Sequence, residues 1–351
     1  MGAGLSALSN TTRASAKTPP SGSARSSPQS TSRPAGGACR FDRLKALSEV
    51  EGQRELELSH QLDFSLSYLQ DATRELGRRA LSKEDHWTYT PLTPPEEAKA
   101  LVVYLDGTCG AICHEGCKQI MVGAIDMLDA EGHRLETAYV AHAPEEGKGT
   151  FLARMERELD RLDKRYGKVL WMGMCDGAPD LQAWLEAQCD YCTLDFYHVS
   201  EYVGRSAPAF GKTQAAQQAW LEETLHELKH HPGGAIKLRR KLTRALEAQD
   251  LGSELKTALV DAHRYVSNNP FDCAQGGRIE RMDYAGNRTL DLPIGSGVIE
   301  AACKHVVKAR VACSGMKWKR KGLQAVLTLR SLYQSTGRWD QFWGKVQVLG
   351  W

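Results

Sequence analysis

The sequence predicts an α/β fold, a mixed β-sheet covered by helices, with an all-helical insertion late in the chain. Three observations predict it. After residue 98, apolar runs of strand length alternate with segments whose apolar residues recur at helical spacing. The turn Asp129-Ala130-Glu131-Gly132 joins two of these runs as a hairpin, so part of the sheet is antiparallel. Residues 199–267 are helical in pattern throughout.

The expected elements follow the order strand, strand, strand, helix, strand, helix, strand, and then helices. Strands are expected over 100–106, 119–128, 134–142, 169–175 and 193–197. Flanking helices are expected over 151–166 and 180–188, and the final helices over 297–310 and 322–334. An aromatic tail with Trp339, Phe342 and Trp343 is expected to pack back on the core.

The chain divides into five expected segments. Residues 1–40, rich in Ser, Thr, Ala, Pro and Gly, are expected to be a disordered low-complexity segment. Residues 41–98 are expected to form a helical amino-terminal remnant and a linker. The sheet-containing core has a first part, 99–198, and a last part, 292–351, that carries basic helices and the aromatic tail. Residues 199–291 form the helical insertion and a loop between the fifth strand and the helix that carries Glu300.

Composition excludes several classes of protein. The chain has 351 residues, 42% of them hydrophobic, and a formal net charge of +2, so net charge alone gives no argument for a nucleic-acid partner. Its ten cysteines are typical of reduced thiols in a cytosolic chain rather than a disulfide framework. No apolar run approaches the roughly 18 residues of a membrane span, so we expect a cytoplasmic protein without a membrane partner.

Three acidic residues point to metal-dependent chemistry. The stretch 292–304 places Glu300 just inside an expected helix, with Ser296 as its N-cap, among apolar neighbours where a carboxylate needs a partner or a cation. Asp106 and Asp176 each close a strand-like apolar run. Taken singly, each aspartate is typical of a strand end or a turn. Together the three carboxylates suit two-metal phosphoryl transfer, with Mg²⁺ (or Mn²⁺) bound by Asp106, Asp176 and Glu300.

A basic cluster follows Glu300 directly, and residues 301–330 contain no Asp or Glu. Cations with an interleaved aromatic residue suit a polyanion such as DNA, whereas the alternative is a solvated helix face. The residues expected to bind DNA are Lys304, Lys308, Arg310, Lys317, Trp318, Lys319, Arg320 and Lys321. The run 237–241 forms a second basic patch.

Two further groups of residues leave alternatives open. His198 follows Asp195-Phe196-Tyr197 and is a candidate to order the site, contact a phosphate or carry a proton, while the alternative is a hydrogen-bonded structural role for Asp195 and His198. Cys109, Cys113 and Cys117 lack the spacing of paired zinc knuckles, so free thiols are expected there and zinc is the alternative.

Seven short blocks occur in order between residues 99 and 343, a span of 245 residues (343 − 99 + 1). They are Leu105-Asp106-Gly107-Thr108, Met121-Val122-Gly123-Ala124-Ile125, Pro144-Glu145-Glu146-Gly147-Lys148, Asp176-Gly177-Ala178, Leu194-Asp195-Phe196-Tyr197-His198, the stretch 292–304, and Ser314-Gly315-Met316-Lys317-Trp318. In these blocks the chain resembles the catalytic part of the ISKra-type insertion-sequence transposases, which belong to the DDE class.

The resemblance implies an RNase H-like fold with Asp106, Asp176 and Glu300 as the catalytic triad, at spacings of 70 (176 − 106) and 124 (300 − 176) residues. It implies metal-dependent cleavage of transposon ends, strand transfer into target DNA, and a homo-oligomer on DNA. Asp195 to His198 resemble a D-x-x-H element of related transposase groups, which adds His198 to the candidate catalytic residues.

The amino-terminal region departs from that family. Residues 1–98 carry no zinc-finger or helix-turn-helix signature for recognising transposon ends, so we expect a truncated or frameshifted copy. Two other functions stay open: a catalytically inactive DNA-binding remnant, which would bind DNA without Mg²⁺, and a zinc hydrolase built on Cys109 to Cys117. A dinucleotide-binding loop at Gly295-Ser296-Gly297 fails because Glu300 stands at the third glycine position.

Overall fold

The computed structural model describes residues 65–248, 252–268 and 281–350. The expectations for residues 1–64 and for the loop around Gly276-Gly277 lie outside the described residues.

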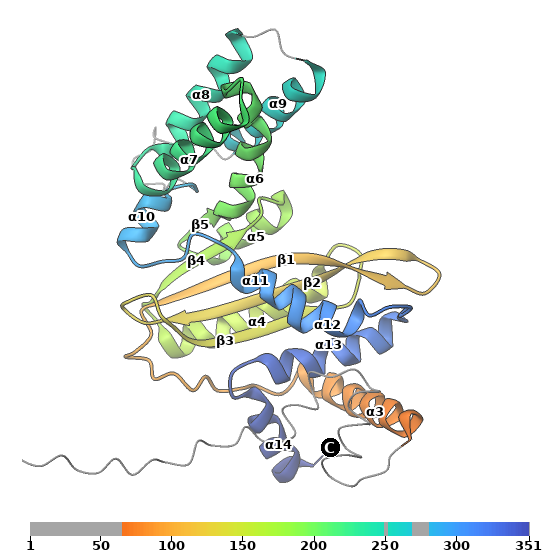
Figure 1. The fold of residues 1–351 in the computed structure, drawn as a ribbon. Helices are drawn as coiled ribbons and strands as arrows, with labels where there is room; N and C mark the ends of the chain where they lie inside the picture. Colours follow the sequence, from red (N-terminus) through yellow and green to blue (C-terminus); the bar gives the residue numbers. More distant parts are fainter. Residues whose placement is uncertain (1–64, 249–251, 269–280, 351) are drawn as a thin grey trace, which may run out of the picture.

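A five-stranded mixed sheet forms the centre of the described chain, with the strand order β3-β2-β1-β4-β5 (Figure 1). The pairs β1–β2 and β2–β3 are antiparallel, while β1–β4 and β4–β5 are parallel. This arrangement confirms the predicted α/β class with a mixed sheet, and it is consistent with an RNase H-like fold. The strands are β1 (Ala100–Ile112), β2 (Gly116–Leu128), β3 (Arg134–His142), β4 (Leu170–Cys175) and β5 (Tyr191–Leu194).

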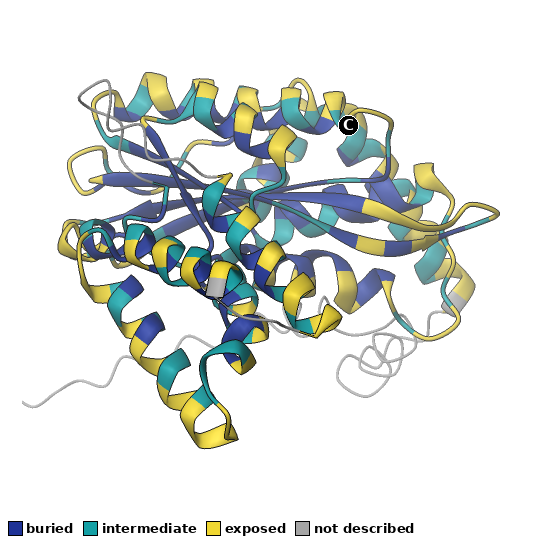
Figure 2. Cartoon of the chain, turned by 90° about the horizontal axis from the view of Figure 1, so that it is seen from above, coloured by how far each residue is buried: buried dark blue, intermediate teal, exposed yellow. Residues whose placement is uncertain are grey.

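Helices cover both faces of the sheet, and the alternation of side chains along β1 shows how the faces differ. Leu101, Val103 and Leu105 pack in one core cluster with residues of α4 and α5. Val102 and Tyr104 pack in the other with residues of the helices that follow residue 296. Figure 2 shows the strands buried through the centre of the sheet and exposed toward the tip of the β1–β2 hairpin. The covering helices are α4 (Gly149–Tyr166) and α5 (Pro179–Gln188) on the first face, and α11 (Gly297–Ala302), the π-helix η3 (Cys303–Lys308), α12 (Ala309–Val311) and α13 (Arg320–Gln334) on the second.

A group of helices lies in sequence between β5 and α11, and above β4 and β5 in the view of Figure 1. It has its own core cluster, which includes Leu228, Leu238, Leu242 and Leu259. We call it the helical region. Its elements are α6 (Phe196–Ser206), η1 (Ala207–Phe210), α7 (Gln214–His230), α8 (Gly234–Ala248), α9 (Ser253–Ser267) and α10 (Tyr284–Thr289).

A small aromatic cluster joins α3 (Leu66–Glu84) to α14 (Arg338–Leu349) and α13. Phe342 is fully buried there and lies 5.7 Å from the ring of Trp87 and 5.9 Å from that of Trp339. The expected aromatic tail therefore packs back on the molecule, against Trp87 after α3 and against α13.

Several strand boundaries differ from the predicted ones: β2 begins at Gly116 and β4 at Leu170, and the largest differences concern β1 and β5. β1 does not end at Asp106, because it pairs with β2 as far as Ile112↔Gly116 and forms a long projecting hairpin. The Asp-Gly pair suggested a turn, but cross-strand hydrogen bonds continue through it. β5 ends at Leu194 because the Asp195 side chain accepts a hydrogen bond from the Tyr197 amide and caps α6. Within the part of the chain that the structure describes, no helix has the length and apolar character to cross a membrane.

Candidate active site

Asp106 lies on β1, and Asp176 directly follows β4, the parallel neighbour of β1. The β1–β4 register pairs Tyr104 with Met174, an offset of 70 (174 − 104) that also separates the two aspartates. Both have the parity of residues that face α11 and α13, namely Tyr104 on β1 and Met174 on β4. The register therefore brings Asp106 and Asp176 to the same edge of the sheet, with Asp176 two residues beyond the last β1–β4 pair.

The carboxylate of Asp106 is half-buried and has two close donors. Its Oδ1 accepts from the Gly107 amide at 2.6 Å, and its Oδ2 accepts from Cys303 Sγ at 3.5 Å. Burial raises the pKa of Asp106, and the negative charge of Asp176 raises it further, while the Gly107 amide, the Cys303 thiol and the charge of His198 act in the opposite direction. A bound cation would favour the ionised form of Asp106.

Asp176 lies directly after β4, in the turn that leads into α5. Its Oδ1 accepts from the Ala178 amide at 3.1 Å, and its backbone carbonyl accepts from the hydroxyl of Tyr265 at 2.7 Å. Gly177 has φ +93°, which side-chain-bearing residues rarely adopt, so the turn needs glycine there. Tyr265 belongs to α9, so a helix of the helical region contacts this turn directly.

Glu300 lies in the first turn of α11 and is exposed. Ser296 holds the N-cap position as expected, but its side chain makes no capping hydrogen bond; its carbonyl accepts from the Ile299 and Glu300 amides instead. Oδ1 of Asp195 accepts from the Ser296 amide at 3.1 Å and also caps α6. One buried carboxylate thus fixes the start of α11 against the end of β5.

The helix changes its winding three residues after Glu300. The π-helix η3 begins at Cys303, and such turns are frequent at functional sites. Burial raises the pKa of the Cys303 thiol, with further contributions from Asp106 and, more weakly, Glu300. Cys303 therefore contacts the β1 aspartate from the same helical run that carries Glu300, although its position in the sequence gave no signal of this.

His198 lies in α6 and is partly exposed. Its ring packs edge-on against Tyr202 and Tyr265, with ring centres 5.5 and 5.7 Å away, and its Nδ1 is 4.0 Å from a Glu201 carboxylate oxygen. Its charge makes a small contribution that lowers the pKa of Asp106.

The three carboxylates suit a divalent ion in chemistry, because hard cations such as Mg²⁺ and Mn²⁺ prefer oxygen donors. Their ligand atoms do not all lie within 4.8 Å of one another, so at least one of these side chains would have to move for all three to hold one ion. Among the described residues, the group that does meet this distance is Asp129, Glu131 and His133, at the turn between β2 and β3. Asp129 already accepts hydrogen bonds from the amides of Glu131 and His133 there.

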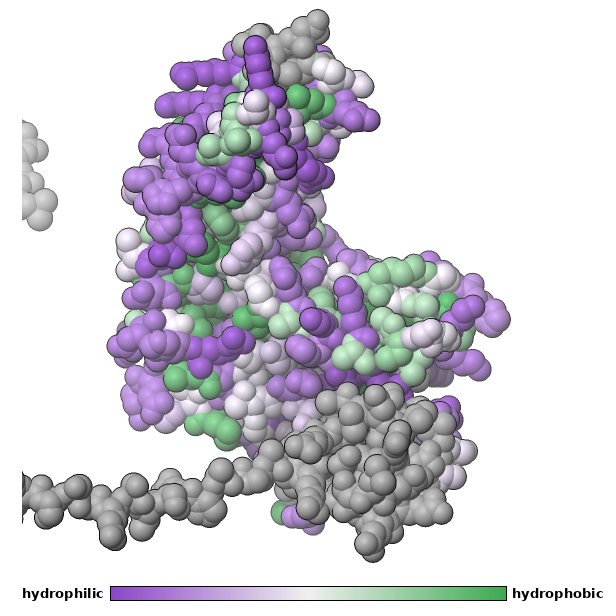
Figure 3. Space-filling view, viewed as in Figure 1, coloured by the Kyte–Doolittle hydropathy of each residue, from purple (hydrophilic) through white to green (hydrophobic). Residues whose placement is uncertain are grey.

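Most of the expected DNA-binding cations are exposed along the covering helices and the loop before α13: Lys304, Lys308, Lys317, Lys319, Arg320 and Lys321. Figure 3 shows this side of the molecule hollowed between the helical region and the projecting β1–β2 hairpin. The small patch at 237–241 is partly neutralised, because Lys237 and Lys241 both pair with Glu227 at 2.9 Å.

Three members of the expected basic cluster have structural contacts. Arg310 is 8% exposed and lies 5.7 Å from the centre of the Trp318 ring, so it does not face solvent with the lysines. Trp318 donates its Nε1–H to the Val311 carbonyl at 3.1 Å and pairs its backbone with β1 beside Ile112. Arg320 pairs with Glu115 at the hairpin tip. Contacts between distant segments, which spacing alone does not reveal, occupy these side chains.

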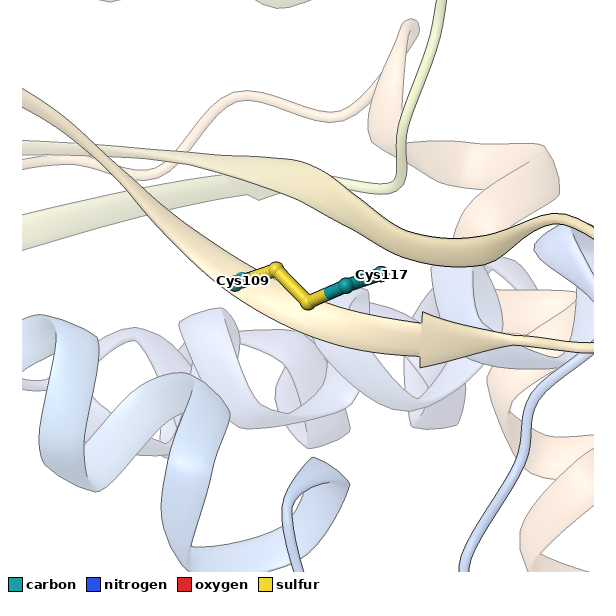
Figure 4. The surroundings of a disulfide bond; sticks show 2 residues. All are labelled: Cys109 and Cys117. Carbon is teal, nitrogen blue, oxygen red and sulfur yellow. A yellow bond between two sulfur atoms is a disulfide. The ribbon is translucent and has the colours of Figure 1, made fainter.

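Cys109 and Cys117 are joined as a disulfide across the β1–β2 hairpin (Figure 4). Cys109 pairs in register with Gln119, and Cys117 pairs with Ala111, so the two cysteines are diagonal neighbours on one face, with Cα atoms 5.9 Å apart. The expectation of free thiols was therefore wrong for these two residues, because hairpin pairing brings them together. Cys113 is a free thiol, so the three cysteines do not form a three-thiolate zinc site in this state.

Comparisons with known proteins are sparse. No protein-family model matches the sequence, and no curated protein matches it. Among solved structures, the chain is similar to the Drosophila P element transposase strand transfer complex, with 10% sequence identity, 89% of this chain and 80% of that chain covered, and a TM-score of 0.30. A likeness of this size carries no weight for fold or function, so the proposals below rest on the geometry of the site.

Proposed function

We propose that the chain is a DDE transposase with an RNase H-like catalytic domain, which cleaves transposon-end DNA and joins it to target DNA. The observation that carries this proposal is the placement of Asp106 on β1 and of Asp176 directly after the parallel neighbour β4, together with the raised pKa of Asp106. Two carboxylates at one edge of the sheet offer the oxygen donors that a divalent cation prefers.

Each site residue has a proposed role. Asp106 and Asp176 would hold Mg²⁺ or Mn²⁺, and Glu300 would complete the set from the first turn of α11. When bound, the ions supply an activated water or 3′-hydroxyl and stabilise the leaving oxygen. Cys303 orients Asp106 through its hydrogen bond, and Asp195 holds the start of α11. His198 is proposed to contact a phosphate or to move a proton beside Asp106.

The exposed lysines after Glu300 are proposed to bind the DNA backbone. Residues 301–330 contain no acidic side chain to compete with phosphates. The hollow between the helical region and the hairpin is proposed to receive DNA. Paired transposon ends would be held by a homo-oligomer.

A second candidate function is a catalytically inactive DNA-binding remnant. One observation favours it: the ligand atoms of Asp106, Asp176 and Glu300 do not all lie within 4.8 Å of one another. A remnant would keep the lysine surface and bind DNA equally well with and without divalent metal.

The two candidates separate in a nicking assay on a labelled plasmid that carries this coding sequence with its natural flanking DNA. We expect Mg²⁺- or Mn²⁺-dependent nicking by the native protein. Asp106→Asn should lower the rate by roughly a hundredfold or more, because losing a metal ligand removes several kcal/mol of transition-state stabilisation. The matched control is Asp160→Asn, which changes an exposed aspartate on α4. DNA binding without metal-dependent nicking would favour the remnant.

A further inference from the structure

We propose that Tyr265 is a positioning residue, which fixes the backbone of Asp176 and thereby the metal-binding geometry of the site. This inference rests on the proposed function and deepens it. It also assigns a role to the helical region, which carries Tyr265 on α9.

The contact between Tyr265 and the turn is direct. Its hydroxyl donates to the Asp176 carbonyl at 2.7 Å. A Cβ built on Gly177 would lie 3.3 Å from the same hydroxyl, so the hydroxyl lies close against the turn that orients Asp176. The preceding carbonyl, that of Cys175, accepts from the Asp195 amide at 3.0 Å. Asp176 is the first residue beyond the β4–β5 ladder, and its carbonyl is held by a side chain from another part of the chain.

The ring of Tyr265 is itself held in place. It stacks on Tyr202 of α6 with ring centres 4.3 Å apart and planes 16° apart, and the guanidinium of Arg205 lies 4.4 Å from the centre of the Tyr202 ring. His198 packs edge-on against both tyrosines. A stack supported in this way restricts rotation of the Tyr265 side chain, so its hydroxyl meets the turn in one position.

The stack therefore links the helical region to the turn that carries Asp176. Tyr265 holds Asp176 through its backbone carbonyl, and His198 packs on the same two rings. A residue that orients a metal ligand without touching the metal typically changes metal affinity or activity by 10- to 100-fold when it is removed. We expect Tyr265 to act in this way, and expect the docking of α6 and α9 to influence metal binding.

The test is Tyr265→Phe, which keeps the stacked ring and removes the hydroxyl. Three quantities are measured: Mn²⁺ affinity by calorimetry without DNA, the Mg²⁺ concentration for half-maximal nicking, and hydrogen exchange of the peptide spanning residues 173–182. We expect the Mn²⁺ affinity to fall about tenfold and the Mg²⁺ concentration for half-maximal nicking to rise about tenfold. Hydrogen exchange at the turn should become faster. Tyr68→Phe, which alters an exposed tyrosine of α3, is the matched control and should match the native protein.

The outcomes separate this inference from the function on which it rests. If the native protein is active and Tyr265→Phe keeps the native Mn²⁺ affinity and Mg²⁺ requirement, the positioning role alone is overturned. A lower unfolding temperature with unchanged metal constants would also overturn it, because that result describes a purely structural hydroxyl. A native protein that neither binds Mn²⁺ nor nicks DNA would overturn the proposed function, and this inference with it.

Discussion

Substitution of Gly177 tests whether the backbone geometry of the turn after β4 controls the position of Asp176. Gly177→Ala places a side chain at φ +93°, with its Cβ 3.3 Å from Leu194 Cδ2 and from the Tyr265 hydroxyl. Holding a residue in such a sparsely populated region costs about 1–3 kcal/mol. The crowding adds to this cost, because either the tyrosine or the turn must move. We therefore expect lower stability together with a displaced Asp176.

Gly147→Ala is the matched control. Gly147 also precedes a helix and has φ +75°, but nothing lies within 4 Å of its built Cβ, so the substitution adds backbone strain without crowding. We expect it to lose about 1 kcal/mol, which is roughly 2–4 °C in unfolding temperature, and to nick DNA at the native rate. Gly177→Ala should lose more stability and should also need more Mg²⁺ for half-maximal nicking.

Circular dichroism melting and Mg²⁺ titration of nicking measure the two effects. Native-like metal dependence in Gly177→Ala would refute the reasoning that the turn geometry controls Asp176. Equal loss of activity in Gly147→Ala would refute it as well. The crowding that Gly177→Ala causes and Gly147→Ala does not would then have no effect on activity.

Two further predictions concern stability. Burial raises the pKa of Asp126 to about 6, so the folded protein binds this proton more tightly than the unfolded chain and loses up to about 3 kcal/mol as pH rises from about 4 to 7. Asp126→Asn, which keeps a hydrogen-bond acceptor for Thr137, should therefore gain stability over the native protein as pH rises, and a pH-independent difference in urea unfolding would contradict this. Gly77→Ala should lower the melting temperature although alanine favours helices, because its Cβ would lie 2.8 Å from the Ala325 carbonyl oxygen. Gly344→Ala, in a helix with open space, should raise the melting temperature, so the same sign for both would contradict the packing argument.

Local pattern was sufficient for much of the fold. β3 over 134–142 matches its predicted bounds, because its hairpin turn and apolar pattern are both local. The helix α13 at 320–334 and the continuous helical run from 297 to 311 also follow from apolar periodicity. Predicted boundaries were wrong where contacts with another segment set them. β1 continues past Asp106 because it pairs with β2, and β5 ends at Leu194 because Asp195 bonds to the loop before α11.

The candidate site was likewise predictable from the sequence only in part. The spacing of Asp106 and Asp176 at the ends of apolar runs was visible in the sequence, and the strand register brings the two residues to the same edge of the sheet. Tyr265 carried no local signal, since it looks like any residue of an amphipathic helix until α9 docks beside β4. The pairing of Cys109 with Cys117 and the burial of Arg310 likewise depend on contacts between segments.

The central claim is that Glu300 joins the two strand aspartates in a metal-dependent site that cuts DNA. Its most direct test is strand transfer and nicking by the native protein and by Glu300→Gln, with Mg²⁺ and with EDTA. Glu223→Gln, which changes an exposed helical glutamate of α7, is the control. We predict products with Mg²⁺ for the native protein and the control, and none for Glu300→Gln. Native-like products from Glu300→Gln, or products that persist in EDTA, would contradict the account.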